Sequence, residues 1–197
     1  DSSESRGLGD VYKRQDVTLA PNYSQVLPSE VNTSTNLSKN LSLKIPLLTS
    51  AMDTVTESKM AIAMAELGGI GVIHRNLTIE QQISEIRKVK AKKCLVGAAV
   101  GASPREHLRA QKILKENLDL IVVDTAHAHT KKVGEIIKKI KKLKPKKTSL
   151  CAGNVATAEA AKYLIKLGVD IIKVGIGPGS ICTTRLVAGI GLSLIHI

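Results

Sequence analysis

The feature of this 197-residue sequence that most limits its fold is a repeated pairing of a short apolar run with a stretch of helical periodicity. Each run is followed by small or polar residues and then by the helical stretch, and one repeat has the length of one strand–helix unit. Such alternation predicts parallel strands joined by crossover helices. The runs are residues 45–49, 69–73, 95–100, 120–123, 149–152 and 171–174.

Several helical stretches carry start signals. Residues 103–106 combine an N-cap serine, a proline at the first helical position and a glutamate three residues after the cap, and residues 78–81 form a second capping box. Thr157 is expected to cap a helix that ends at Gly168. Residues 17–43 instead scatter Ser, Thr, Asn and Pro among short apolar pieces, which predicts an irregular lead-in or a small hairpin.

Two architectures accept this repeat, an open doubly wound sheet and a (β/α)8 TIM barrel. The carboxyl ends of all barrel strands meet at one active face, whereas a doubly wound sheet concentrates functional residues at one switch point. Here polar and glycine residues follow nearly every run, so the sequence predicts an α/β fold of the (β/α)8 TIM-barrel class, incomplete, with about six of the eight units present. These residues are 50–53, 74–76, 101–102, 124–127, 153–154 and 175–177.

Composition argues against a nucleic-acid partner. The chain has no Trp or Phe and three Tyr, too few for surfaces on which bases stack. Much of the net charge of +12 comes from nine lysines in residues 131–147, where Val133, Ile136 and Ile140 recur at helical spacing. We interpret these lysines as the solvated face of an amphipathic helix rather than as a polyanion site.

Cysteine usage and hydropathy bear on the compartment. Three cysteines at wide spacing predict free thiols in a reduced, cytoplasmic environment. No apolar run approaches the ~20 residues that span a bilayer, so no membrane partner is expected.

A glycine-rich loop, residues 174–185, follows the last apolar run and presents Cys182 among small and hydroxylated residues. Its alternating glycines, Gly175, Gly177 and Gly179, allow backbone groups to face a ligand or an ion. Polar neighbours and exposed backbone donors would stabilise a thiolate, so local chemistry leaves two interpretations of Cys182 open, a nucleophile and a small buried hydrophobe.

Other features of the cysteines and glycines have simpler interpretations. Cys94 and Cys151 lie in or beside predicted strands and are expected to be small buried hydrophobes. The G-x-G-x-G spacing of the loop differs from the G-x-G-x-x-G fingerprint of dinucleotide-binding proteins. A simple turn would need fewer glycines.

Histidines near the ends of two runs suggest further hypotheses. His127 and His129 would share one face of an extended segment, and Asp124 could join them as a third metal ligand. Asp124 at a strand end is also suited to accept a hydrogen bond from a ribose hydroxyl. His74 has a similar position and could equally be a structural histidine, whereas His107 within a helical stretch is expected at the surface.

Five segments together identify a family resemblance. GIGPGSICTTR, SAMDTVTE, GGIGVIHRN, LVGAAVGA and AGNVAT, which begin at residues 175, 50, 68, 95 and 152, resemble the inosine monophosphate dehydrogenase / GMP reductase family. The resemblance covers residues 16–191, implies a (β/α)8 barrel and leaves residues 1–15 and 192–197 as non-family ends. The segments near the start are more similar to those of the dehydrogenases.

The resemblance implies an oxidoreductase of purine biosynthesis that converts IMP to XMP with NAD+. In that reaction a cysteine thiolate attacks C2 of the hypoxanthine, hydride leaves to NAD+, and water hydrolyses the thioimidate. The implied partner is the small-molecule substrate IMP, and the full-length protein would form a homotetramer.

The resemblance also implies roles for individual residues. Cys182 would be the nucleophile, and Thr184 would help to activate the hydrolytic water. Backbone carbonyls of Gly177, Gly179 and Cys182 would coordinate K+. The residues that would bind the substrate are Ser50, Met52 and Ser180. Those that would contact NAD are His74, Asp124, Thr125, Ala126, Asn154, Gly175, Ile176 and Gly177.

Alternatives to the dehydrogenase remain. A regulatory module that many dehydrogenases insert is absent between Lys90 and Leu95, a feature shared with GMP reductases, which deaminate GMP with NADPH. Other classes are a metal-dependent barrel hydrolase, with Asp124, His127 and His129 as ligands, and a non-catalytic nucleotide-binding fragment. Because LSLIHI at the end does not match the family, we expect the last two strands to be missing and this chain to be inactive alone.

Overall fold

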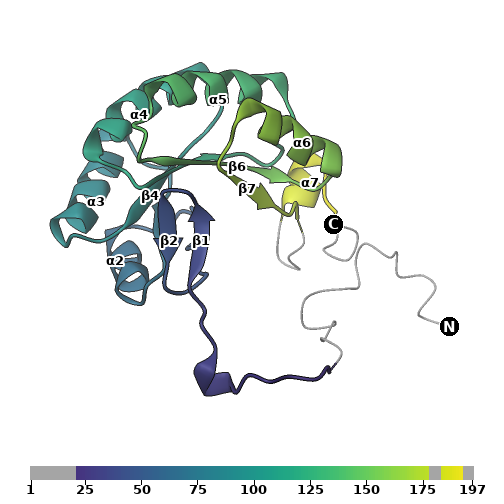
Figure 1. Cartoon of the computed structure of the whole chain (residues 1–197). Helices are drawn as coiled ribbons and strands as arrows, with labels where there is room; N and C mark the ends of the chain where they lie inside the picture. The colour runs from purple at the N-terminus through teal and green to yellow at the C-terminus, as the bar shows by residue number, and fades with distance from the viewer. Residues whose placement is uncertain (1–20, 178–182, 193–197) are drawn as a thin grey trace.

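The computed structural model describes residues 21–177 and 183–192. Its helices form a curved layer over the outer side of a sheet, and a two-stranded hairpin lies on the inner side (Figure 1). The strands are β1 (Thr35–Ser38), β2 (Leu41–Leu43), β3 (Gly71–Ile73), β4 (Val96–Val100), β5 (Leu120–Asp124), β6 (Ser149–Val155) and β7 (Ile171–Val174). The α-helices are α2 (Ser58–Glu66), α3 (Ile79–Ala91), α4 (Pro104–Ile113), α5 (Lys131–Leu143), α6 (Ala158–Leu167) and α7 (Thr184–Ala188). The 3-10 helices are η2 (Pro28–Glu30) and η3 (Leu114–Glu116).

The main sheet is parallel, and its strands lie in the order β3-β4-β5-β6-β7. Each strand therefore pairs with the one before it in the chain, as in a barrel, and the order does not reverse as it does in a doubly wound sheet. This confirms the predicted barrel winding. The first predicted run, 45–49, forms a single parallel bridge between Leu48 and Ile70 rather than a named strand.

The sheet is apolar on both faces, as expected for strands covered on two sides. On β5, Ile121 and Val123 pack outward against the helices, whereas Leu120 and Val122 face inward. The same period of two places Ala152 outward and Cys151 inward on β6. The inner face therefore carries side chains that a ligand entering the barrel would meet.

The helix start signals have mixed outcomes. Thr78 and Gln81 form the expected reciprocal capping box, and Thr157 Oγ1 accepts the N–H of Ala160. Gly168 ends α6 in the left-handed conformation at φ 76°, as predicted.

The predicted capping box at the start of α4 is wrong. Ser103 is the N-cap residue, but its side chain makes no capping hydrogen bond. The carboxylate of Glu106 instead accepts the N–H of Gly101 at 2.7 Å and a hydrogen bond from Arg109 Nε at 3.2 Å. The buried guanidinium of Arg109 competes better for this carboxylate than the N-cap backbone does, because a hydrogen bond between two charged groups is stronger than one between a carboxylate and a neutral N–H.

Helix α5 is amphipathic, as the lysine-rich segment predicts. Val133, Ile136, Ile137 and Ile140 are buried against the sheet, and the lysines lie mostly at exposed positions. Among the described residues, no helix is long and apolar enough to cross a membrane.

The hairpin of β1 and β2 covers the inner face at the amino-terminal end of the sheet. Leu41 and Leu43 pack against inward side chains such as Val72 and Leu120. Ser38 Oγ lies 2.6 Å from Ser149 Oγ at the start of β6, and Asn40 Nδ2 donates to the Lys146 carbonyl at 2.9 Å. The small hairpin expected within residues 17–43 is thus present, and the opposite, carboxyl-terminal ends of the strands stay free of it.

Candidate functional site

Three neighbouring strand ends are joined by hydrogen bonds at the carboxyl-terminal edge of the sheet. The backbone N–H and Oγ1 of Thr125 donate to the Gly153 carbonyl at 2.9 and 3.0 Å, and the Asn154 N–H donates to the Thr125 carbonyl at 2.8 Å. The Asn154 side-chain amide donates to the Gly175 carbonyl at 2.6 Å, and the Gly175 N–H donates to Val155 at 2.8 Å. The residues predicted to contact NAD after β5, β6 and β7 therefore form one surface.

Asp124 ends β5 and is held by a lysine from β7. Its Oδ1 accepts from Lys173 Nζ at 2.9 Å, and the two side chains are 24% and 41% exposed. The next residues, Thr125 and Ala126, are half-buried and exposed. A carboxylate has about four acceptor positions, so Asp124 can accept from a ligand hydroxyl while it keeps Lys173.

The glycines after β7 have backbone angles that favour glycine. Gly175 and Gly177 have φ of 120° and 60°, and both are buried together with Ile176 between them. A Cβ on Gly177 would come within 3.0 Å of Arg185 Cγ, so a side chain there would be both strained and crowded. The backbone of this segment is thus compactly packed just before the predicted nucleophile.

The central part of the predicted loop lies outside the described residues. Gly179, Ser180 and Cys182 belong to this part, so their roles stay predictions. Thr184, which is described, is the first residue of α7.

Ser50 and Met52 lie in a compact turn after the first apolar run. The Ser50 carbonyl accepts the Met52 N–H at 2.9 Å and the Thr56 Oγ1 hydroxyl at 2.6 Å. The side chain of Met52 is 59% exposed. The turn presents two of the three predicted substrate-binding residues at the same edge of the sheet as Asp124.

A cavity of about 320 Å³ lies on the inner face of the sheet, beside this edge. Thr49, Ser50 and Ala51 line one side, and Val122, Cys151 and Lys173 line the other. Burial raises the pKa of the Cys151 thiol to about 12, and the nearby Asp124 carboxylate adds to the rise while Lys173 opposes it. Cys151 is therefore an unreactive wall of the cavity, and the buried hydrophobe predicted for it is confirmed.

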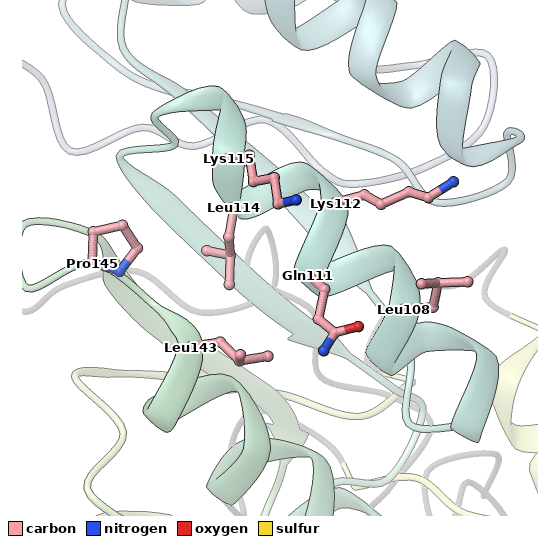
Figure 2. Close-up of a pocket in the computed structure, with 7 residues that line it drawn as sticks. All are labelled: Leu108, Gln111, Lys112, Leu114, Lys115, Leu143 and Pro145. Atoms are coloured by element: carbon pink, nitrogen blue, oxygen red, sulfur yellow. The ribbon is translucent and has the colours of Figure 1, made fainter.

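A second hollow, of about 620 Å³, lies in the outer helical layer between α4, η3 and the end of α5. Figure 2 shows its lining side chains, which include Leu108, Leu114 and Leu143 beside Lys112 and Lys115. It contains none of the predicted site residues and is separated from the inner cavity by the sheet. We assign it no part in the candidate site.

His74, predicted to contact NAD, follows β3 at the same edge of the sheet, and β4 lies between β3 and β5. Its ring follows β3, is 1% exposed and faces Asp53 and Glu57 from the turn before α2. It is not part of the hydrogen-bonded surface formed by Asp124, Asn154 and Gly175.

The metal hypothesis for Asp124, His127 and His129 gains no support from the described residues. The two imidazole rings lie 6.3 Å apart between centroids, and His129 packs against the Tyr163 ring at 5.1 Å. The acidic and histidine side chains that do converge to metal-binding distance within the described part are Asp53, Glu57 and His74.

Sequence reasoning missed Lys173, Asp53 and Glu57. Lys173 could have been found from the sequence. Side chains alternate between the two faces of a strand, so Lys173, two residues after the inward-facing Ile171, also faces inward. Asp53 and Glu57 belong to the SAMDTVTE segment, but no spacing rule links them to a histidine that follows the next strand.

The sequential parallel sheet, with its polar residues at the carboxyl ends of the strands, defines part of a (β/α) barrel whose site lies at that face. Comparison with known proteins is more specific: a model described as IMP dehydrogenase / GMP reductase domain matches residues 12–196. The chain belongs to the IMP dehydrogenase / GMP reductase family.

Individual relatives agree with this assignment. An inosine-5'-monophosphate dehydrogenase from Borreliella burgdorferi is 44% identical, over 91% of this chain and 57% of the relative. A protein of the same name from Cryptosporidium parvum is 42% identical, over 97% and 58%, and one from Staphylococcus aureus is 32% identical, over 91% and 63%. The chain thus spans little more than half the length of these curated relatives.

Proposed function

We propose that this chain is part of the catalytic barrel of an enzyme that oxidises IMP to XMP with NAD+. The observation that carries the proposal is the hydrogen-bonded surface after β5, β6 and β7, which continues directly into the loop with Cys182. Relatives named inosine-5'-monophosphate dehydrogenase support the choice of substrate.

The proposed chemistry begins with a bond between Cys182 Sγ and C2 of the hypoxanthine. C2 then loses a hydride, which leaves a thioimidate on the cysteine. Water adds to C2, the C–S bond breaks, and the products are XMP and the regenerated thiol. Thr184, at the start of α7, would help to remove a proton from that water.

NAD+ supplies the acceptor for the hydride when it is bound. The described residues fit such a cofactor: Asp124 offers a half-buried carboxylate to a ribose hydroxyl, and Thr125 and Asn154 fix the strand ends beside it. Gly175 and Gly177 keep side chains away from the same surface. In the proposal, Ser50 and Met52 border the substrate and Ser180 holds its phosphate.

The finer parts of the proposal follow from the family resemblance. K+ would be held by carbonyls of Gly177, Gly179 and Cys182. The whole protein would act as a homotetramer in the cytoplasm, where its cysteines would remain reduced. Asp124, and not His74, is the described residue best placed to contact the ribose of NAD.

Differential alkylation of the three cysteines tests the proposal on this chain. Iodoacetamide should modify Cys182 faster than Cys94 or Cys151. IMP should slow the modification of Cys182 and leave the rates at the other two cysteines unchanged, as measured by peptide mass spectrometry. The other two cysteines are internal controls in the same molecule. Equal rates at Cys94 and Cys182, or a Cys182 rate that IMP does not change, would contradict the proposal.

The second function within the family is GMP reduction. The short connection from α3 to β4, with Lys92 to Leu95 between them, favours it as the alternative because it leaves no room for a regulatory insertion. The same alkylation test distinguishes the two activities. In a dehydrogenase, IMP and NAD+ together should protect Cys182, whereas in a reductase GMP and NADPH together should protect it.

A further inference from the structure

A cluster of three ionisable side chains lies at the carboxyl-terminal edge of the sheet and is not part of the hydrogen-bonded surface of Asp124, Asn154 and Gly175. His74 follows β3, and Asp53 and Glu57 come from the turn that leads into α2. His74 Nε2 lies 3.7 Å from Asp53 Oδ1 and 3.6 Å from Glu57 Oε1. One ligand atom from each residue lies within 4.8 Å of the other two.

The histidine is the unusual member of this cluster. Its side chain is 1% exposed, and the Asn76 N–H donates to Nδ1 at 3.2 Å. Nε2 faces the two carboxylates, but within the described part of the chain it has no hydrogen-bond partner. A buried polar atom without a partner calls for an explanation, and a bound ion is one of the standard ones.

The carboxylates are available to a ligand. Both side chains are 53% exposed, and Glu57, although it is the N-cap residue of α2, makes no side-chain capping bond. Asp53 Oδ2 accepts from the Asn76 amide, and Oδ1 accepts the Thr54 N–H at 2.9 Å. A carboxylate oxygen has two acceptor positions, so Oδ1, which lies 3.7 Å from His74 Nε2, keeps one for a ligand.

We propose that Asp53, Glu57 and His74 bind a divalent first-row cation of the Mn²⁺ or Zn²⁺ class. Ligand atoms of a tetrahedral centre with bonds of about 2.1 Å lie roughly 3.4 Å apart, close to the 3.6 and 3.7 Å separations of Nε2 from the carboxylate oxygens. One imidazole and two carboxylates suit such ions, and the exposed side leaves coordination positions for water.

Binding would require a change at the imidazole. The Asn76 N–H bond places the proton of the neutral ring on Nε2, so this proton must move to Nδ1 before Nε2 can coordinate a metal. The Asn76 hydrogen bond is then lost. We therefore expect an exchangeable ion rather than one that the fold requires.

The ion would fix the turn that carries Ser50 and Met52. Thr56 lies between the two carboxylates in the chain, and its Oγ1 donates to the Ser50 carbonyl. The Thr56 carbonyl also accepts from the His74 N–H at 3.4 Å. Metal bridging from His74 to Asp53 and Glu57 would thus stiffen the same turn from a second point.

Titration of the full chain with Mn²⁺, followed by electron paramagnetic resonance of the free ion, tests the site. Mn²⁺ is the probe because cysteine thiolates favour softer metals. The wild-type chain should bind one equivalent, and Glu57→Gln and Asp53→Asn should each weaken binding roughly tenfold or more. Glu66→Gln, which removes the same charge from the exposed end of α2, should leave the affinity unchanged.

The two carboxylate variants keep the test interpretable, because both side chains are half-exposed and their amides are close in shape. Circular dichroism should show each variant folded like the wild type. Absence of saturable Mn²⁺ binding at millimolar concentration, or equal affinity in Glu57→Gln, Glu66→Gln and wild type, would overturn the proposal. Neither result depends on the activity proposed for Cys182.

Discussion

At the scale of single residues, the inner face of the sheet shows how environment separates similar groups. Cys151 on β6 is buried in the cavity wall, and its pKa is raised to about 12. Asp124, also inward-facing, reaches the carboxyl-terminal edge, where Lys173 pairs with it. Cys151 pairs with Val122, two positions before Asp124 on β5. This short distance along the sheet separates an inert thiol from an accessible carboxylate.

The raised pKa of Cys151 predicts a pH dependence of stability. Its ordinary pKa is 9.0, so above that pH the unfolded chain loses the thiol proton while the folded chain keeps it until about pH 12. The unfolded state then binds fewer protons, and the free energy of unfolding should fall by about 1.4 kcal/mol per pH unit in this window. Below pH 9.0 the thiol is protonated in both states, and the full stability that its raised pKa gives the folded chain is present.

Urea unfolding at about pH 8 and about pH 10.5 measures this effect as a difference between the two free energies of unfolding. Cys151→Ala should lose less stability between the two pH values than the wild type does. Cys94→Ala is the matched control and should keep the wild-type dependence. Parallel pH profiles for Cys151→Ala and wild type would show that the thiol ionises equally in both states.

At the scale of elements, a buried polar network joins α3 and α4 to the ends of β3 and β4. Gln82 Nε2 donates to the carbonyls of His74 and Ala99 at 3.1 and 2.9 Å, and Arg109 Nη1 donates to Gln82 Oε1 at 2.9 Å. Arg109 also binds Glu106. The network gives hydrogen bonds to carbonyls at the ends of β3 and β4, so it holds both helices in place beside these strand ends.

Arg109→Met should strongly destabilise the fold. The substitution leaves the 9%-exposed Glu106 carboxylate without its cation, and losing one partner of a buried pair typically costs about 3–5 kcal/mol. Chemical denaturation measures the loss. Arg87→Met removes an arginine that is 68% exposed from its pair with Glu116 of η3, which is 17% exposed, so it should cost clearly less than Arg109→Met. Equal losses in the two variants would contradict the role given to the network.

Helices could be predicted from the sequence because their signals are local. The spacing of Val133 and Ile136, the Thr78 capping box and the glycine at 168 act within one or two turns. The hydrogen-bond partners of Glu106 could not be predicted from the sequence. Gly101 and Arg109 compete with the N-cap backbone for its carboxylate, and the outcome depends on how the chain packs.

At the scale of the whole molecule, the winding and the site edge could be predicted, but contacts between distant segments could not. Six apolar runs followed by polar residues were enough to place Asp124, Asn154 and Gly175 at one edge. The position of hairpin β1–β2 across the inner face depends on contacts between residues more than 100 positions apart, and the periodicity of the sequence does not predict such contacts. The cluster of Asp53, Glu57 and His74 arises in the same way.

The described sheet ends at β7, which among the described strands pairs with β6 alone. An unpaired strand edge promotes association with other chains, and a lysine on such a strand opposes it. Val174 on β7 is 55% exposed, so Val174→Lys should reduce concentration-dependent self-association of this chain, measured by light scattering during size-exclusion chromatography.

The control for this prediction is Val187→Lys on α7. Val187 is 83% exposed, and its substitution adds the same charge on a helix instead of on the strand. Self-association that falls equally in both variants would mean that net charge, rather than the edge of β7, governs it.

The hairpin across the inner face has a consequence for how the chain folds during synthesis. Each strand from β4 onward can pair with its predecessor as soon as it leaves the ribosome, whereas Ser38 must wait for Ser149, 111 positions later, before it meets its partner. At about 5–20 residues per second, that delay is on the order of 5–20 s. For this interval the apolar side of the hairpin, Leu41 and Leu43, lacks its full cover, which makes the nascent chain a natural client for a chaperone.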